Sequence, residues 1–374
     1  MKKLFYSLFG FFFRICRSFP VRRNRVSLVS PHKGGNHDSL MEICDYLNSK
    51  GGFEIIFISS SQLDFDSRHI LASIGQIFNF FIMKAMMLAT SEYVFLNDNF
   101  MPMANLRFSE QTVVTQLWHA EGAFKKFGLM TDLPEDIRTR QQQCSDRLTY
   151  VICSSKNVVP VYSKAFGVLE KQVLPLGSAR VDYLLREHNT DALRHELEFR
   201  HPGCVGKKLI LYAPTFRDDP YDDREILSHI SPGLFSKELG NEYALLVKLH
   251  PQVHNGGTPE SAIDVTNYDI ADLTLLCDLL ITDYSSVCMN FALLNKPCIF
   301  FAFDLDKYER ERSFCFGYED YVPGPIVKNF DELIEAIKNP QTADNMQRFR
   351  EFNFDYFDCD NTKRIVERII SANP

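Results

Sequence analysis

Four short stretches of the chain place residues that bind phosphate or move protons directly after an apolar segment. In the first, the apolar residues 279–282 are followed by Asp-Tyr-Ser-Ser at residues 283–286 and then by a helix-like segment. Ser285 and Ser286 would begin that helix, where free backbone N–H groups, two hydroxyls and the helix dipole attract an anion. Serine is also a common helix N-cap, so a purely structural role is the alternative.

Two histidines end other apolar segments. His250 follows residues 244–249, and His119 follows residues 112–118. A histidine in such a position can donate to a phosphate oxygen, protonate a leaving group or take a proton from an attacking hydroxyl. Glu121 is a second candidate base beside His119. For each histidine, the structural alternative is an ordinary polar residue at the end of a strand.

Two arginines lie near further strand ends. Arg217 closes the sequence Tyr-Ala-Pro-Thr-Phe-Arg, and Arg180 closes the sequence Gly-Ser-Ala-Arg. The planar guanidinium group suits phosphate oxygens, whereas an ion pair between Arg217 and its neighbour Asp218 is the structural alternative. Together the four stretches suit transfer of a phosphorylated group by positioning and charge stabilisation.

Motifs that the chain lacks disfavour several other classes of protein. Neither G-x-x-x-x-G-K-[ST] nor G-x-G-x-x-G is present, which excludes P-loop and dinucleotide-binding proteins. No Asp-x-Asp motif stands at a predicted strand end, and the ten cysteines contain no C-x-x-C pair. The net charge of −7 gives no support for nucleic-acid binding. We therefore expect no metal, no cofactor and no nucleic-acid partner.

The elements that must position these residues alternate between apolar, β-branched strands and helix-like segments. A length of 374 residues suggests two domains, since one domain averages ~150 residues. The first set of strands runs from residues 25–30 to 173–177, and the second from 208–213 to 298–301. This alternation predicts parallel sheets covered on both faces. We expect two α/β domains whose polar strand-end residues face an interdomain cleft.

The N-terminal segment, residues 1–25, is basic and rich in phenylalanine. Residues 4–13 are almost continuously apolar, but a span of the bilayer needs about 20 residues. Apolar rings between cations predict a helix on the membrane surface, and the alternative is a first helix packed on its domain. The two α/β domains are then predicted at residues 26–195 and 196–374.

These stretches, in this order, resemble the CDP-glycerol glycerophosphotransferase family of teichoic-acid and capsule synthesis. The resemblance runs from about residue 97 to residue 337 and is densest at residues 279–325. Its ordered motifs are Trp-His, Tyr-Ala-Pro-Thr, His-Pro, Thr-Asp-Tyr-Ser-Ser and Pro-Gly-Pro. The resemblance implies a GT-B-like fold of two Rossmann-like domains. The N-terminal one would lie on the acceptor side, and the C-terminal one would bind the CDP donor.

The resemblance also implies roles for single residues. His119 matches the base that deprotonates the acceptor hydroxyl, which attacks the β-phosphorus of the donor so that CMP leaves. His250 matches a histidine that contacts the donor phosphate. The remaining matched positions would bind the donor: Ala120, Glu121, Gly122, Ala123, Arg180, Pro214, Thr215, Lys248, Leu249, Ser285, Ser286 and Asn290.

Three positions depart from the family pattern. Ala120 stands where glycine is usual, so the loop after His119 is expected to differ, and Phe216 stands where tryptophan is common. Asn290 replaces an acid and so keeps a polar contact without the charge. Glycerol, ribitol, another polyol and a sugar-phosphate variant therefore stay open as the transferred group.

The expected function is transfer of glycerol phosphate, or a related polyol phosphate, from CDP-glycerol to a lipid- or polymer-linked acceptor. Teichoic acid or capsule synthesis at the cytoplasmic face of the bacterial cell membrane, with peripheral attachment, would be its setting. One alternative is a GT-B nucleotide-sugar glycosyltransferase in surface polysaccharide synthesis. Another is a non-catalytic scaffold. Whether one unit or many are added stays open.

Overall fold

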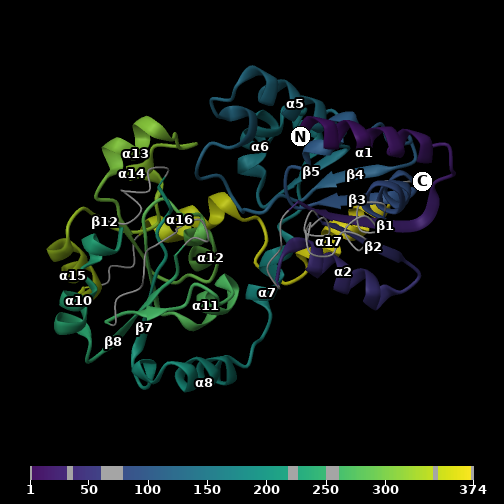
Figure 1. Cartoon of the computed structure of the whole chain (residues 1–374). Coiled ribbons are helices and arrows are strands. Elements are labelled where there is room, and N and C mark those ends of the chain that lie inside the picture. The colour runs from purple at the N-terminus through teal and green to yellow at the C-terminus, as the bar shows by residue number, and fades with distance from the viewer. Residues whose placement is uncertain are drawn as a thin grey trace, which may run out of the picture. The chain divides into compact units, whose positions relative to one another are not determined.

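The apolar segments form two parallel sheets in the computed structural model, which describes residues 2–31, 37–59, 79–217, 226–249, 261–339 and 344–371. Each sheet belongs to its own compact unit (Figure 1). The first unit comprises Met1–Asp182 and Asp358–Pro374, and the second comprises Tyr183–Phe357. The prediction of two parallel-sheet α/β domains is therefore confirmed.

The sheet of the first unit has the strand order β2-β1-β3-β4-β5-β6, and each neighbouring pair runs parallel. The order reverses at β1, which pairs with both β2 and β3. Side chains of these strands are mostly buried, as a sheet covered on two faces requires. The strands are β1 (Arg22–Ser30), β2 (Glu54–Ser59), β3 (Ser91–Leu96), β4 (Val113–Gln116), β5 (Tyr150–Cys153) and β6 (Val173–Pro175).

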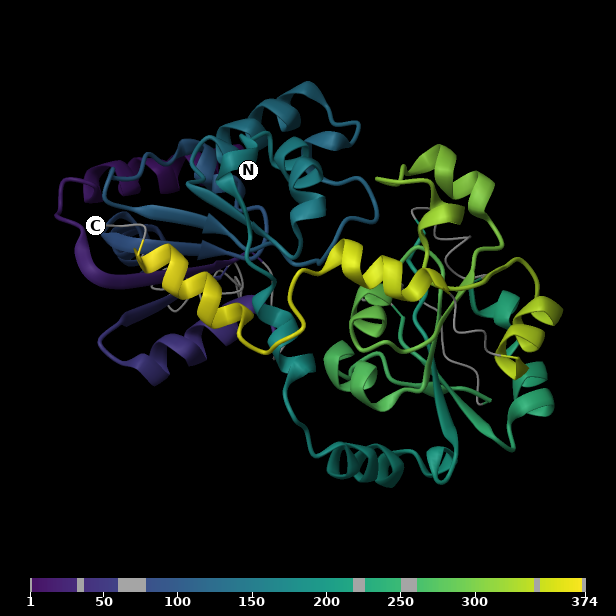
Figure 2. The same ribbon diagram turned by 180° about the vertical axis from the view of Figure 1, so that it is seen from behind.

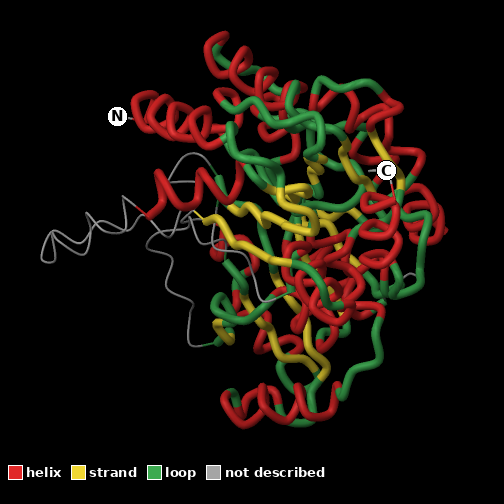
Figure 3. The backbone as a smooth tube through the Cα atoms, turned by 90° about the vertical axis from the view of Figure 1, so that its right-hand side faces the viewer, coloured by secondary structure: helices red, strands yellow, loops and turns green. Residues whose placement is uncertain are grey.

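Helices pack against this sheet; Figure 3 draws the helices of the chain in red and its strands in yellow. The α-helices of the first unit are α1 (Lys2–Cys16), α2 (Ser39–Lys50), α4 (Ala85–Ala89), α5 (Glu135–Ser145), α6 (Val159–Phe166) and α17 (Asn361–Ser371). The described residues of the first unit also contain one π-helix and five 3₁₀ turns. They are η2 (Asn79–Lys84, the π-helix), η3 (Met101–Asn105), η4 (Gly128–Met130), η5 (Lys156–Val158), η6 (Glu170–Gln172) and η7 (Ala179–Val181). The short α7 (Asp182–Leu185) lies at the unit boundary.

Helix α1 packs one side against η2, α4 and η3. Phe9, Phe13 and Cys16 are buried there. The interpretation of α1 as a first helix packed on its domain is thus correct for this side. Among the described residues, no helix is both long enough and apolar enough to cross a bilayer.

The sheet of the second unit has the order β12-β11-β10-β7-β8-β9, again with parallel neighbours. In chain order this is 6-5-4-1-2-3, the arrangement of dinucleotide-binding folds, and it reverses between β7 and β10. The strands are β7 (Lys208–Tyr212), β8 (Tyr243–Val247), β9 (Ile263–Asp264), β10 (Leu279–Thr282), β11 (Cys298–Phe301) and β12 (Ile326–Val327). The two-residue strands β9 and β12 were not predicted because they are too short to show a hydrophobic pattern.

The helices of the second unit pack around an apolar core built from β7, β8, β10 and β11. They are α8 (Thr190–Arg200), α10 (Pro232–Leu239), α11 (Ile270–Leu276), α12 (Val287–Leu293), α13 (Leu305–Glu311), α14 (Tyr318–Tyr321), α15 (Phe330–Lys338) and α16 (Asp344–Asn353). The 3₁₀ turn η8 (Pro202–Cys204) precedes β7.

The C-terminal helix α17 returns to the first unit, beside α2 (Figure 2). Ile365, Val366 and Ile369 bury the apolar face of α17 in the core of the first sheet. The units therefore divide after Asp182 and again before Asp358, whereas the predicted division lay at residue 195 with the whole C-terminus in the second domain. Local sequence patterns do not reveal a partner that is so distant along the chain.

Asp182 fixes the start of α17. Its carboxylate is fully buried and accepts hydrogen bonds from the Asn361 N–H at 3.0 Å, the Asn361 side chain at 2.7 Å and the Thr362 N–H at 2.7 Å. A side-chain oxygen that accepts from first-turn N–H groups is a helix cap. Here the capping residue lies about half the chain away from the helix that it caps.

Asp182→Ala is expected to lower the free energy of unfolding of the first unit by about 2 kcal/mol, because a cap is lost and buried N–H groups are left without acceptors. Trp118 is the only tryptophan of the chain and lies in this unit, so its fluorescence during urea unfolding reports the change. Asp191→Ala, on the exposed start of α8, is the control. A midpoint and slope equal to those of the unmodified protein would contradict the capping role.

Candidate functional site

The reversal of strand order in the second sheet brings two predicted stretches together. β7 and β10 are neighbours, and their carboxyl ends lead into Pro214-Thr215 and into residues 283–286, which we call the serine loop. The Thr215 N–H donates to Asp283 Oδ1 at 2.8 Å. Ligands of such sheets bind beyond the strand ends where the order reverses. The two stretches therefore form one candidate site.

The hydroxyls of the serine loop are largely uncommitted. Ser286 precedes α12 but makes no side-chain capping bond, and Ser285 Oγ accepts from the Val287 N–H at a long 3.4 Å. Thr215 Oγ1 is buried and has no hydrogen-bond partner among the described residues. Helix capping therefore does not account for these side chains, and their hydroxyls are available to a ligand.

Asn290 lies one helical turn beyond Ser286 in α12. Its side chain is only 4% exposed, and it makes no hydrogen bond with any described residue. Buried amides are normally hydrogen-bonded, so a bound ligand would supply the partner that this side chain lacks. Asn290 thus fits the candidate site.

Other predicted residues of the second unit have structural partners. Arg217 is buried between Asp283 and Asp304, and Asp218 lies outside the described residues. The ammonium group of Lys248 donates to two backbone oxygens, those of Thr266 and Tyr268, at 2.8 and 2.6 Å.

Leu249 and His250 follow Lys248 directly. Leu249 is buried, and its N–H donates to the Thr266 hydroxyl at 3.3 Å. His250 lies outside the described residues. The expected donor contacts of both residues therefore rest on the family resemblance.

In the first unit, a strained turn presents His119 at the end of β4. The strand ends at Gln116, earlier than predicted, and Trp118 has a φ of 63°, in the left-handed region that bulky residues avoid. The indole ring holds the turn by stacking on Phe127, with centroids 5.0 Å apart. The Gln116 side chain accepts from the Trp118 N–H at 2.9 Å.

The same turn explains how alanine is tolerated after His119. Positive φ values fall on Trp118 and Gly122, and Ala120 is not among the residues with positive φ. The Ala120 carbonyl accepts from the Tyr162 hydroxyl at 2.9 Å, and the Gly122 N–H donates to Ser154 Oγ at 2.8 Å. The loop is thus fixed by hydrogen bonds that need no glycine at position 120.

The His119 imidazole keeps about half of its surface exposed. Its Nδ1 lies 3.6 Å from Asp98 Oδ2. The surrounding residues remove hydration and lower the pKa of His119 below its ordinary value of 6.5, although Asp98 acts in the opposite direction and Arg180 adds to the lowering. At neutral pH the ring is therefore neutral and able to accept a proton.

Glu121 and Arg180 contact each other and the residues of this loop. Glu121 is buried, its Oε1 lies 3.4 Å from Arg180 Nε, and it accepts from the Ser178 hydroxyl at 3.1 Å. Arg180 also donates to the His119 carbonyl. Glu121 is thus paired and not a free base. Ala123, at the end of the loop, is buried.

Asp98 is a site residue that the sequence analysis missed. It follows β3, the neighbour of β4, so the carboxyl ends of adjacent strands bring it to His119. The available signal was the one used elsewhere, a polar residue directly after an apolar segment. Among the described residues, no group of three or more His, Cys, Asp or Glu side chains is arranged to hold a metal ion.

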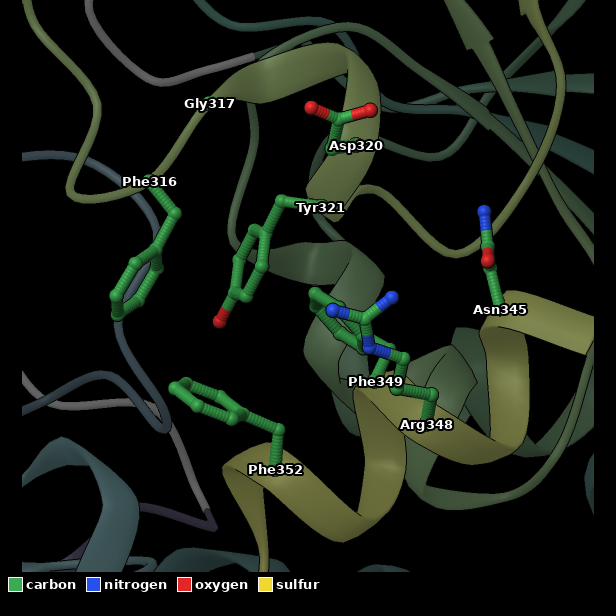
Figure 4. Close-up of a pocket in the computed structure, with 8 residues that line it drawn as sticks. All are labelled: Phe316, Gly317, Asp320, Tyr321, Asn345, Arg348, Phe349 and Phe352. Atoms are coloured by element: carbon green, nitrogen blue, oxygen red, sulfur yellow. The ribbon is translucent and has the colours of Figure 1, made fainter.

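A separate pocket of about 190 Å³ lies between α14 and α16. Figure 4 shows the rings of Phe316, Tyr321 and Phe352 gathered on one side of it, with Arg348 and Asn345 on the other. None of the predicted site residues lines this pocket. Its walls are mainly aromatic, and it is distinct from the strand-end residues described above.

Comparison with known proteins finds a family whose model matches almost the whole chain. The family described as CDP-Glycerol:Poly(glycerophosphate) glycerophosphotransferase matches residues 11–371. The chain is 33% identical over 386 residues to the teichoic acid poly(ribitol-phosphate) polymerase of Bacillus spizizenii, which covers 99% of this chain and 60% of that protein. It is 32% identical over 303 residues to the teichoic acid glycerol-phosphate primase of Bacillus subtilis, covering 78% of this chain and 77% of the primase.

A solved structure supports the fold. The structure of the wall teichoic acid polymerase TagF matches with a TM-score of 0.77 at 22% identity, over 98% of this chain and 93% of that chain. The predicted GT-B-like class of fold, with two α/β domains, is thereby confirmed.

Asp98→Asn is expected to move the pKa of His119 further down, because the carboxylate beside Nδ1 stabilises the protonated ring. NMR titration of the His119 ring protons measures this pKa. Asp132→Asn, an exposed change in the same unit, should leave it unchanged. An unchanged or higher pKa in Asp98→Asn would show that Asp98 does not act on the ring.

Proposed function

Because the chain belongs to the CDP-glycerol glycerophosphotransferase family, we propose that it transfers a polyol phosphate from a CDP-activated polyol to an acceptor hydroxyl. The observation that carries the proposal is the family match over residues 11–371. The matched polymerase and primase are named for teichoic acid, so the proposed acceptor is a lipid- or polymer-linked chain of a bacterial surface polymer. The chain spans about 60% of the length of that polymerase.

On the acceptor side, His119 is proposed as the general base. Its neutral ring takes the proton of the acceptor hydroxyl, whose oxygen attacks the β-phosphorus of the donor. The bond from that phosphorus to the bridging oxygen breaks, and the electron pair leaves with CMP. The lowered pKa supports this role, since the ring stays unprotonated until the pH falls below that value. Asp98 orients the ring through Nδ1.

On the donor side, Thr215, Ser285 and Ser286 are proposed to donate hydrogen bonds to phosphate oxygens. Their hydroxyls lie at the strand ends where the second sheet reverses, and protein partners do not occupy them fully. Preorganised donors stabilise the charge that grows on the phosphoryl oxygens during transfer. The proposed contacts of His250, Arg180, Pro214, Lys248 and Leu249 rest on the family resemblance.

We propose glycerol as the polyol, with ribitol as the second candidate. The family description names glycerophosphate, whereas the matched Bacillus spizizenii polymerase is a ribitol-phosphate enzyme. Asn290 supplies a buried amide without a protein partner, which can donate to and accept from polyol hydroxyls. An uncharged amide at this position is compatible with either polyol.

We also propose peripheral attachment to the cytoplasmic face of the bacterial membrane through α1. The side of this helix opposite its buried face carries Leu4, Leu8, Phe11 and Ile15, all exposed. Their spacing of four, three and four residues places them on one face of a helix. Exposed Arg14 and Arg17 stand nearby, as suits a helix lying on anionic lipid.

The transfer proposal predicts CMP release from CDP-glycerol or CDP-ribitol when an acceptor is present. His119→Ala should reduce kcat by a factor of about 10² or more, the usual contribution of a general base. His195→Ala, on the exposed surface of α8, is the matched control and should keep full activity. The assay measures CMP and UDP together, with UDP-sugars as parallel donors.

Two outcomes of this assay would reject the proposal. UDP release from a UDP-sugar without CMP release would identify a nucleotide-sugar glycosyltransferase instead. Full polymer synthesis by His119→Ala would point to a non-catalytic role for the first unit. The relative rates with CDP-glycerol and CDP-ribitol decide the polyol.

The membrane proposal predicts that Leu4→Ser with Phe11→Ser weakens binding to vesicles containing anionic lipid by about tenfold or more, because exposed apolar area is lost. The two side chains are 74% and 55% exposed. Leu169→Ser, at a residue that is 61% exposed elsewhere on the first unit, is the control. Cosedimentation measures the bound fraction, and equal binding of all three proteins would refute attachment through α1.

A further inference from the structure

Three charged side chains, two of them buried and one partly buried, lie in contact next to the serine loop. Arg217 lies between Asp283, the first residue of that loop, and Asp304, which precedes α13. The Arg217 side chain is only 5% exposed, and that of Asp283 only 2%. Such burial is costly for charged groups unless they are paired and hydrogen-bonded, so their arrangement is informative.

The guanidinium group of Arg217 uses each of its nitrogens on the protein itself. Nε and one terminal nitrogen donate to the two oxygens of Asp304 at 2.8 and 3.0 Å, in the fork geometry that Arg–carboxylate pairs favour. The same terminal nitrogen lies 2.9 Å from Asp283 Oδ2, and the other donates to the Thr215 carbonyl at 2.6 Å. Arg217 is thereby fully occupied and is not available to a donor phosphate.

Tyr284, the second residue of the serine loop, joins the same group. Its hydroxyl donates to Asp304 Oδ1 at 2.8 Å, and its ring stacks on Tyr308 with centroids 3.8 Å apart. Burial raises the pKa of Tyr284 and Asp304 raises it further, so the hydroxyl remains a donor. The Arg217 guanidinium lies over both rings, 5.2 and 5.3 Å from their centroids.

Asp283 connects these charges to the backbone that a donor would meet. Its Oδ1 accepts from the N–H groups of Thr215 and Tyr284, and its carbonyl accepts from the Tyr318 hydroxyl at 2.8 Å. Both the strand end after β7 and the serine loop after β10 are therefore tied to one buried cluster.

We propose that Arg217 and Asp304 are positioning residues that hold the serine loop in the conformation that receives the CDP donor. This inference rests on the proposed function only in the identity of the donor. The pair acts through Asp283 and Tyr284 and places the hydroxyls of Ser285 and Ser286, which follow them directly. Precise placement of such groups governs how well they stabilise a transferring phosphoryl group.

The choice of variant follows from the charge balance. One guanidinium group pairs with two carboxylates, so replacing Arg217 would leave a buried and a partly buried carboxylate without their cation and would endanger folding. Asp304→Asn keeps the shape of the side chain and leaves Arg217 paired with Asp283 one to one. It weakens the fork and removes one charge only. Asp306→Asn, two residues further along on the exposed surface of α13, is the matched control.

The experiment has one readout that needs no substrate and one that does. Hydrogen–deuterium exchange of the peptide covering residues 283–287, without ligand, reports whether the loop is held. Steady-state kinetics with the preferred CDP-polyol reports KM for donor and acceptor separately. We expect faster exchange in Asp304→Asn, a donor KM raised at least tenfold and an acceptor KM within twofold of the unmodified enzyme. Asp306→Asn should match the unmodified enzyme in both.

Tyr284→Phe provides a second, milder test because it removes a single hydrogen bond to Asp304. In the double variant with Asp304→Asn, the rise in donor KM should be smaller than the product of the two single effects, since both changes release the same contact. Independent, multiplicative effects would show that Tyr284 and Asp304 do not act as one unit.

Each result decides the inference. Unchanged exchange in Asp304→Asn would overturn it, and so would faster exchange with an unchanged donor KM, since the cluster would then be structural only. If the unmodified protein transferred nothing from any CDP-polyol, the proposed function would fail. The exchange measurement would still decide whether Arg217 and Asp304 hold the loop.

Discussion

All strands of a parallel sheet run in the same direction, so their carboxyl ends lie along one side of the sheet, and this constraint brings the candidate residues of each unit together. It brings Thr215 to Asp283 across 68 residues, because β7 and β10 are neighbours where the second sheet reverses its order. In the first sheet it brings Asp98 to His119 at the ends of β3 and β4. Without the sheet, the loops alone would not bring these residues together.

Each unit has an arginine–carboxylate contact at the loop that follows a strand end, partly exposed in the first unit and buried in the second. Arg180 lies against Glu121 and bonds the backbone of His119, and Arg217 is shared by Asp283 and Asp304. Arg180 was predicted to contact the donor, and for Arg217 a phosphate contact and a structural ion pair were both open. Arg217 is buried and fully paired within the protein, whereas Arg180 is partly exposed.

The two sheets and their strand ends were predicted from the sequence, because apolar runs rich in β-branched residues form few structures other than buried strands. The return of α17 was not predicted, since its cap, Asp182, lies about 180 residues earlier and no local pattern records that pairing. The role of Arg217 was equally hidden, because its fork partner Asp304 is 87 residues away. Ser285 and Ser286 were found from their place between an apolar segment and a helix start, and Asn290 from the family resemblance. The structure adds that their polar groups lack full protein partners.

In the proposed reaction, the acceptor oxygen attacks the β-phosphorus of a CDP-polyol and CMP leaves. A donor labelled with ¹⁸O at the bridge between its two phosphorus atoms tests this directly. The reaction can be followed by ³¹P NMR, in which the heavier oxygen shifts the resonance of the phosphorus that carries it. We expect the label to leave with CMP and to be absent from the new phosphodiester. Label retained on the transferred polyol phosphate, or no transfer from any CDP-polyol, would contradict the proposed reaction.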